Sequence, residues 1–194
     1  MVEDHKSVEN NYFFKQDVVF KSENGILFCS IIAIIWFLLN TIVLYLIKGS
    51  FSFLADSFNH TVFEPEYTLP LFLAGIIFQE LIKSTLLKVL AKVKFKQQII
   101  GFSITSFMPY VHSKYPILLK NYRTVILLSS LSVLLFILLN YSFDNNRFLL
   151  LTSFWLFFSG YDLYTVYLLR KFNKTFLVAD HQELPGAVIY DNPF

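Results

Sequence analysis

Apolar residues fill four long stretches of the chain, and short polar segments separate them. The stretches cover residues 26–47, 70–90, 124–141 and 148–169. Each is close to the roughly 20 apolar residues that a helix needs to cross a bilayer. The pattern therefore predicts an all-α membrane protein with four transmembrane helices.

Lysine and arginine are distributed unevenly among the segments outside the predicted spans. Three of these segments are basic, through Lys6, Lys15, Lys21, Lys92, Lys94, Lys96, Lys114, Lys120, Arg123, Arg170, Lys171 and Lys174. The other two carry only Lys48 and Arg147. Because positive residues are retained on the cytoplasmic side, both termini are expected in the cytoplasm. The expected organisation is a cytoplasmic tail over 1–25, an integral domain in the cell membrane over 26–169, and a cytoplasmic tail over 170–194.

The segment between the second and third predicted spans has a different pattern. From Gln98 to Val111, β-branched and aromatic residues partly alternate with serine and threonine, ahead of and around Pro109. This pattern favours a short strand or hairpin on the cytoplasmic side, although an irregular amphipathic connector fits it equally well. The open edge of such a strand could receive an extended peptide by β-addition.

Composition supports a membrane environment. Of the 194 residues, 55% are hydrophobic, 19% aromatic and 15% charged, and the formal net charge is +2. The mean hydropathy of +0.54 is too high for a soluble globular domain, so the lipid bilayer is the expected surrounding. The single cysteine, Cys29, excludes an intramolecular disulfide, and the basic segments lack the aromatic interleaving that would indicate a nucleic-acid partner.

A polar stripe interrupts the second predicted span. Lys83 follows Gln79 by four positions and Glu80 by three, and Ser84 follows Glu80 by four, so a helix places these four residues on one side. Charged residues at membrane depth are costly and mark candidate functional sites.

The fourth predicted span has a matching interruption at Asp162. At about 1.5 Å per residue, Lys83 and Asp162 lie about 20 and 21 Å from the outer ends of their spans. This agreement predicts an ion pair between them, with Glu80 nearby. The simplest interpretation is that the three charges only hold the helices together.

A zinc site is a second interpretation of these carboxylates. Catalytic zinc takes three protein ligands and an open position, and Glu80 and Asp162 could supply two of them. The four histidines, His5, His60, His112 and His181, lie outside the stripe. Of these, His112 is the candidate third ligand.

Over most of the chain, the motifs resemble those of a zincin peptidase family. Its members are small four-span membrane proteins, related in plan to site-2-type intramembrane metalloproteases. That family carries His-Glu-x-x-His in its second span, where this chain has Gln79-Glu80-x-x-Lys83. The other corresponding stretches are Met108-Pro109-Tyr110-Val111-His112, Ser159-Gly160-Tyr161-Asp162, and Asp180-His181-Gln182-Glu183-Leu184-Pro185-Gly186 running to Tyr190.

The resemblance implies unequal roles for the matching residues. Glu80 corresponds to the general base and Asp162 to the third zinc ligand, while Gln79 and Lys83 replace the two histidine ligands. Glutamine is a poor zinc ligand and lysine is a cation. The resemblance therefore implies a degenerate bacterial family member without a metal, in which the Lys83 ammonium supplies part of the positive charge that zinc would bring.

Three functions remain open from the sequence. The first is a catalytically inactive pseudopeptidase that binds a peptide or a membrane-protein partner. The alternative is an active intramembrane metalloprotease with a non-standard zinc site formed by Glu80 and Asp162, joined by His112. A small transporter that uses Glu80 is a third hypothesis, which no internal repeat supports.

Overall fold

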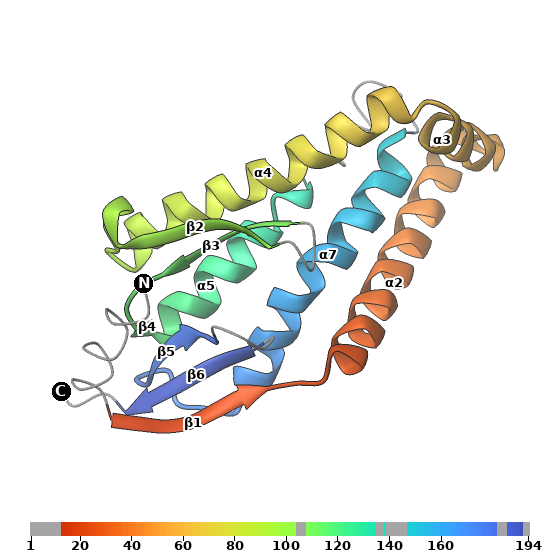
Figure 1. Ribbon diagram of the computed structural model, residues 1–194. Coiled ribbons are helices and arrows are strands. Elements are labelled where there is room, and N and C mark those ends of the chain that lie inside the picture. Colours follow the sequence, from red (N-terminus) through yellow and green to blue (C-terminus); the bar gives the residue numbers. More distant parts are fainter. Residues whose placement is uncertain (1–12, 104–107, 135–137, 139–146, 182–185, 192–194) are drawn as a thin grey trace.

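The structure is a computed structural model that describes residues 13–103, 108–134, 138, 147–181 and 186–191 (Figure 1). Five α-helices lie within these residues. They are α2 (Ser22–Lys48), α3 (Ser52–Phe63), α4 (Pro65–Leu90), α5 (Leu119–Ser130) and α7 (Arg147–Leu169).

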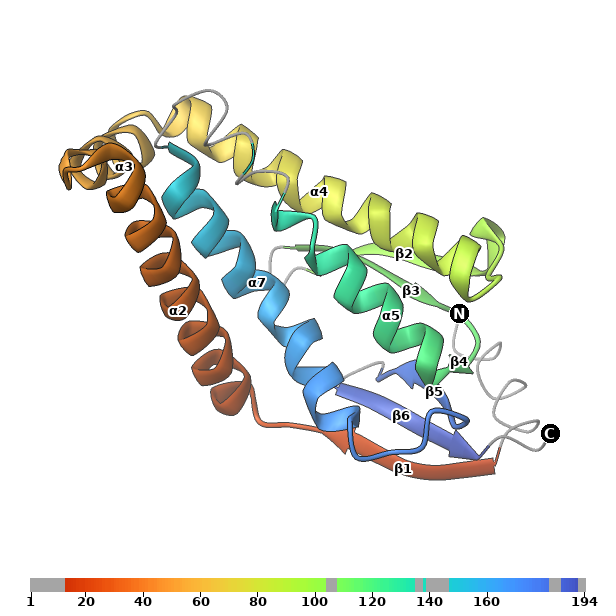
Figure 2. The same cartoon turned by 180° about the vertical axis from the view of Figure 1, so that it is seen from behind.

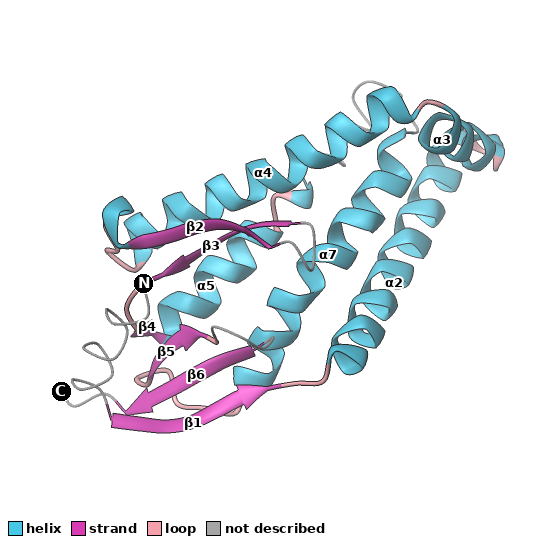
Figure 3. Ribbon diagram, in the orientation of Figure 1, coloured by secondary structure: helices cyan, strands magenta, loops and turns pink. Residues whose placement is uncertain are grey.

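Six strands lie within the same residues and form two antiparallel sheets (Figure 3). The larger sheet has the order β1-β6-β5-β4, and the smaller is the hairpin β2-β3. The strands are β1 (Phe13–Val19), β2 (Gln98–Ser103), β3 (Met108–Ser113), β4 (Ile117–Leu118), β5 (Leu177–Asp180) and β6 (Gly186–Asp191).

The two kinds of element occupy opposite parts of the molecule. Helices α2, α4 and α7 run from the strands to the far end, where α3 lies, and α5 lies between α4 and α7 (Figures 1 and 2). Helix α7 packs against both α2 and α5, so it is the central helix of the group. The β2-β3 hairpin lies along the strand-side end of α4.

The main hydrophobic core lies at the strand end, where strands and helix ends meet. Its buried members come from nearly every element of that end, and include Val18, Leu87, Val111, Leu119, Val125, Leu169, Val178 and Ile189. A smaller cluster of Leu44, Phe53 and Leu149 joins α2, α3 and α7 at the far end. Packing therefore fixes the strand end most firmly, and this is the end that carries the polar residues of α4.

The close pairing of β1 with β6 depends on Gly186. Its φ of +140° belongs to the region that favours glycine, and a Cβ atom there would lie 2.8 Å from the Cα atom of Val19. A side chain at this position would separate the first residues of β6 from β1.

The expected all-α fold with four transmembrane helices is wrong. Helix α5 has 12 residues, about 18 Å of helix, which is shorter than the roughly 30 Å hydrocarbon core. Helix α7 is long enough to cross a bilayer. Serine, threonine and Asp162 interrupt its apolar sequence, so it is not among the candidate membrane spans. The segments expected as tails supply β1, β5 and β6 of the larger sheet. The third predicted span extends to residue 141, and residues 135–137 and 139–141 lie outside the described part.

In the part of the chain that the structure describes, two helices are long and apolar enough to cross a membrane. They cover Glu23–Lys48 in α2 and Glu66–Leu90 in α4, with mean hydropathies of 2.6 and 1.4. Only 11% of the most apolar part of α2 is buried inside the protein. Its outer face is formed by large apolar side chains, among them Leu27, Ile31, Ile34, Ile35, Leu38, Leu39, Ile42, Leu46 and Ile47.

The hairpin predicted between Gln98 and Val111 is confirmed. Strands β2 and β3 pair from Gln98 opposite Ser113 to Ser103 opposite Met108. On β2, the side chains of Ile100 and Phe102 are 68% and 56% exposed. No further strand pairs with β2 among the described residues, so its outer edge is open.

Candidate functional site

The polar stripe of α4 faces the interior of the protein at the strand end. Gln79, Lys83 and Ser84 are buried, and the Glu80 side chain is 13% exposed. Helical spacing places these residues on one side, and the packing of α4 against α5, α7 and β3 covers that side.

The ion pair predicted from helix depth is present. Lys83 Nζ donates a hydrogen bond of 2.7 Å to Asp162 Oδ2, and the same nitrogen lies 4.0 Å from Glu80 Oε2. Asp162 comes from α7, so the pair joins the two helices. The Lys83 side chain is buried and that of Asp162 is 33% exposed. Removing one member of a fully buried pair costs about 3 to 5 kcal/mol, which is the upper bound here, because water can reach part of the remaining Asp162 charge.

Gln79 makes a separate connection between the same helices. Its side-chain oxygen accepts hydrogen bonds from Trp155 Nε1 and from Ser159 Oγ, the latter at 2.8 Å. Both donors lie on α7, one helical turn apart. The residue at the first expected ligand position therefore acts as a clamp between α4 and α7.

Ser84 connects α4 to the hairpin. Its hydroxyl donates a hydrogen bond of 2.6 Å to Gln98 Oε1, and Gln98 Nε2 donates one of 3.0 Å to the Ser84 carbonyl oxygen. Both side chains are buried. These two bonds fix the start of β2 against α4, so the hairpin has a defined position beside the charged residues.

Glu80 lies between Lys83 and the second strand of the hairpin. Its carboxylate faces the backbone amide of Val111 in β3, while its Oε2 atom is buried without a hydrogen-bond partner in the described structure. At 4.0 Å, Lys83 offers this oxygen electrostatic compensation in place of a hydrogen bond. Glu80 is thus held by the charge of Lys83 together with the backbone amide of Val111.

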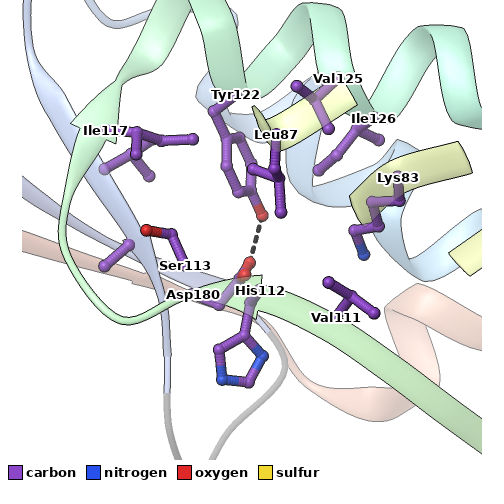
Figure 4. A pocket seen from close by; sticks show the side chains of 12 residues that line it. Lys83, Leu87, Val111, His112, Ser113, Ile117, Tyr122, Val125, Ile126 and Asp180 are labelled. Carbon is purple, nitrogen blue, oxygen red and sulfur yellow. Dashed lines mark hydrogen bonds between the residues drawn. The ribbon is translucent and has the colours of Figure 1, made fainter. Parts of the chain in front are cut away.

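A second acidic group, Asp180 of β5, belongs to the same site. The Tyr122 hydroxyl of α5 donates a hydrogen bond to Asp180 Oδ1, and Tyr122 is itself buried (Figure 4). Burial raises the pKa of the Asp180 carboxyl, although the Lys83 ammonium and His112 act to lower it. Burial and the nearby Asp180 carboxylate also raise the pKa of Tyr122 well above its usual value, so its hydroxyl remains a donor at neutral pH.

The space between these side chains is very small. Lys83, His112, Tyr122 and Asp180 line a cavity of about 10 Å³, together with apolar residues of α5, β3 and β5 (Figure 4). This volume has room for about one water molecule, so a peptide cannot enter the cavity.

The sequence identified only part of this site. The residue pattern found Glu80, Lys83 and Asp162, because charges stand out in apolar helices. It missed the contact of Tyr122 with Asp180, which lie 58 residues apart in segments interpreted as a connector and a tail. The only signal was the position of Asp180 at the start of the tail motif.

The proposed zinc ligands Glu80, Asp162 and His112 do not form a metal-binding group. Among the described residues, no set of three or more His, Cys, Asp or Glu side chains is arranged to hold a metal ion. His112 lines the small cavity, whereas His60 pairs with Glu64 at the far end, at 2.8 Å. The backbone amide of His181 bonds to Gly186 in the turn between β5 and β6, and His5 lies outside the described residues.

Known proteins provide no match from which a role for these residues could be transferred. No family model, no curated protein and no solved structure matches the chain. The resemblance to the zincin family remains a prediction that rests on the sequence motifs, and the function must be argued from the site itself.

Proposed function

We propose that this protein is an integral membrane protein without catalytic activity, a pseudopeptidase in zincin terms, that binds an extended peptide segment of a partner. The observation that carries the proposal is the position of Lys83. Its ammonium lies between Asp162 and Glu80, at 2.7 and 4.0 Å. These are the carboxylates that a zinc ion would need.

Charge balance favours this interpretation over a metal site. A zinc site with three protein ligands collects its carboxylates around a dication and leaves one position open. In this protein an ammonium occupies that central position, and Gln79 directs its oxygen to donors on α7. A zinc ion in this position would have to displace the Lys83 ammonium, because the dication and the ammonium would repel each other.

The membrane part of the proposal rests on α2 and α4. Both helices are long and apolar enough to span a membrane, and α2 exposes apolar side chains along most of its length. Most of the described lysines and arginines lie in or next to the strands and the helix ends that meet them, whereas Lys48 and Arg147 lie at the far end. The positive-inside rule therefore favours the cytoplasmic side for the strand end of the helices and for both termini.

Binding at the hairpin follows from its open edge. Strand β2 has one unpaired side, and main-chain groups on such an edge can bond to an added strand. Ile100 and Phe102 expose apolar side chains two residues apart, a spacing that suits contact with an extended peptide. The bonds between Ser84 and Gln98 hold this edge in place.

Panning of a displayed library of short random peptides against the purified full chain in detergent tests the proposal. We expect enrichment of extended, β-prone peptides, and we expect Ile100→Lys to abolish it, because a lysine on an edge strand opposes strand addition. Phe14→Lys is the matched control, since Phe14 is an exposed aromatic residue on the edge strand β1 of the other sheet.

Two results would contradict the proposal. Equal enrichment on wild type and Ile100→Lys would exclude β2 as the binding edge. Stoichiometric zinc in the same wild-type preparation, lost on substitution of Asp162 by asparagine, would show that the site is a working metal centre.

A further inference from the structure

A second, larger cavity opens at the strand-side end of α4. Its volume is about 400 Å³, within the range of small-molecule binding sites. About half of the lining is apolar: Lys92 and Asn121 supply polar side chains, and the apolar part comes from Leu90, Ala91, Pro116, Ile117, Leu118 and Leu177. An apolar wall with one cation and one amide suits an amphiphile with an anionic head.

The position of the cavity is that of a membrane interface. Leu90 is the last residue of the candidate span in α4, and Lys92 follows it by two positions. A group bound at Lys92 would therefore lie at headgroup level when α4 crosses a bilayer.

The segment around the cavity carries positive charge only. Between Glu80 and Asp144 the sequence contains no aspartate or glutamate, and its basic residues are Lys83, Lys88, Lys92, Lys94, Lys96, Lys114, Lys120 and Arg123. A backbone hydrogen bond of 3.3 Å from the Lys120 amide to the Lys174 carbonyl oxygen brings a further lysine beside this segment. Basic clusters next to a membrane span attract anionic lipids, at about 1 kcal/mol per residue.

Lys92 has an unusual backbone conformation. Its φ of 58° makes it the only described non-glycine residue with a positive φ. A left-handed residue just after a helix is usually glycine, because a Cβ atom is disfavoured in that conformation. The neighbouring Val93 amide bonds to the Leu87 carbonyl oxygen and closes the helix end, so the backbone holds the Lys92 side chain at the cavity.

We infer that this cavity binds the phosphate-containing headgroup of an anionic phospholipid. Lys92 supplies the charge, Asn121 supplies hydrogen bonds, and the apolar wall receives the first carbons of the acyl chains. The inference rests on the proposed membrane location but adds a ligand, and it is independent of peptide binding at β2.

The test measures thermal unfolding of the full chain in detergent with added phosphatidylglycerol or phosphatidylcholine of the same acyl chains. We expect phosphatidylglycerol to raise the unfolding temperature more than phosphatidylcholine does. Lys92→Gly is the informative variant, because glycine removes the ammonium and suits the left-handed backbone, so the variant should fold at least as well as wild type. Its affinity for phosphatidylglycerol should fall roughly fivefold.

Lys96→Gln is the matched control, since Lys96 is exposed in the same basic segment but does not line the cavity. Equal effects of the two lipids on wild type, or an equal loss of affinity in Lys96→Gln and Lys92→Gly, would overturn the inference. So would stabilisation by inorganic phosphate alone that matches the effect of the lipid. Absence of the protein from washed membranes would instead contradict the proposed membrane location.

Discussion

At the scale of single residues, Lys83 connects groups from three helices and the larger sheet. It bonds to Asp162 of α7, lies near Glu80 of its own helix, and lines the cavity in which Tyr122 of α5 meets Asp180 of β5. One ammonium therefore compensates several carboxylates. This arrangement makes the site sensitive to a single substitution.

Lys83→Met tests that sensitivity. Methionine keeps most of the side-chain volume but leaves Glu80 and Asp162 without a counter-charge, so the free energy of unfolding should fall by up to about 3 to 5 kcal/mol. Chemical denaturation in detergent measures the change.

Lys88→Met is the matched control on the same helix. Lys88 is exposed and places its ammonium 4.6 Å from the centre of the Phe95 ring, a contact worth about 0.5 to 1 kcal/mol at an exposed site. Similar losses in the two variants would show that Lys83 has no special structural role.

The residue-level site could be predicted only where charge stood out against an apolar background. Lys83 and Asp162 were found in this way, and counting residues along two helices was enough to pair them. Tyr122, Gln98 and Asp180 lie in mixed polar segments, where such residues are common. Their burial depends on tertiary contacts that local sequence does not contain.

At the scale of elements, the apolar pattern predicted helices better than strands. The long runs of α2 and α4 were predicted well, because uninterrupted apolar sequence has few alternatives. Strands β1, β5 and β6 are short and carry charged residues, so they were interpreted as tails. Alternation is visible in β6, where Ala187 and Ile189 are buried and their neighbours are not, but six residues give a weak signal.

Helix α7 was predicted in extent, and its Asp162 pairs with Lys83 as expected. Gly160 has a packing role that was not predicted: it allows α2 to approach closely, and a Cβ atom there would lie 2.8 Å from the Cβ atom of Cys29. Small residues at such crossings let two backbones pack together.

Gly160→Ala should therefore separate α2 from α7. We expect a loss of about 1 to 3 kcal/mol in unfolding free energy, as for other overpacked contacts. Cys29→Gly removes the side chain that alanine would meet, so the double variant should lose less than the sum of the two single changes. Strict additivity in this double-mutant cycle would contradict the contact.

At the scale of the whole molecule, apolar side chains are buried in one part of the protein and exposed in another. The strand end has a buried core, whereas α2 presents apolar side chains outward along most of its length. Exposed apolar surface of this extent marks contact with a membrane or a partner. Helix α2 is long and apolar enough to cross a lipid bilayer.

Lysine substitutions at different depths along α2 can show whether its exposed face contacts lipid or water. Ile35, near the middle of the candidate span, and Ile47, near its end, are 52% and 64% exposed. In a bilayer, Ile35→Lys should cost about 3 kcal/mol, whereas Ile47→Lys should cost much less because its ammonium reaches the interface. The amount of newly made protein recovered in washed membranes measures this difference.

On a surface facing water, each of these substitutions would change stability by about 0.5 kcal/mol or less. Equal recovery of the two variants would therefore contradict a span through α2.

The pairing of β1 with β6 has a consequence for synthesis. Phe13 lies opposite Asp191, so the earliest described strand finds its neighbour only after the residues up to Asp191 have left the ribosome. Until then β1 is an unpaired strand with open hydrogen-bonding groups, which favours aggregation. A fragment released before residue 186 would keep β1 unpaired. Such fragments should therefore aggregate unless the cell degrades them quickly.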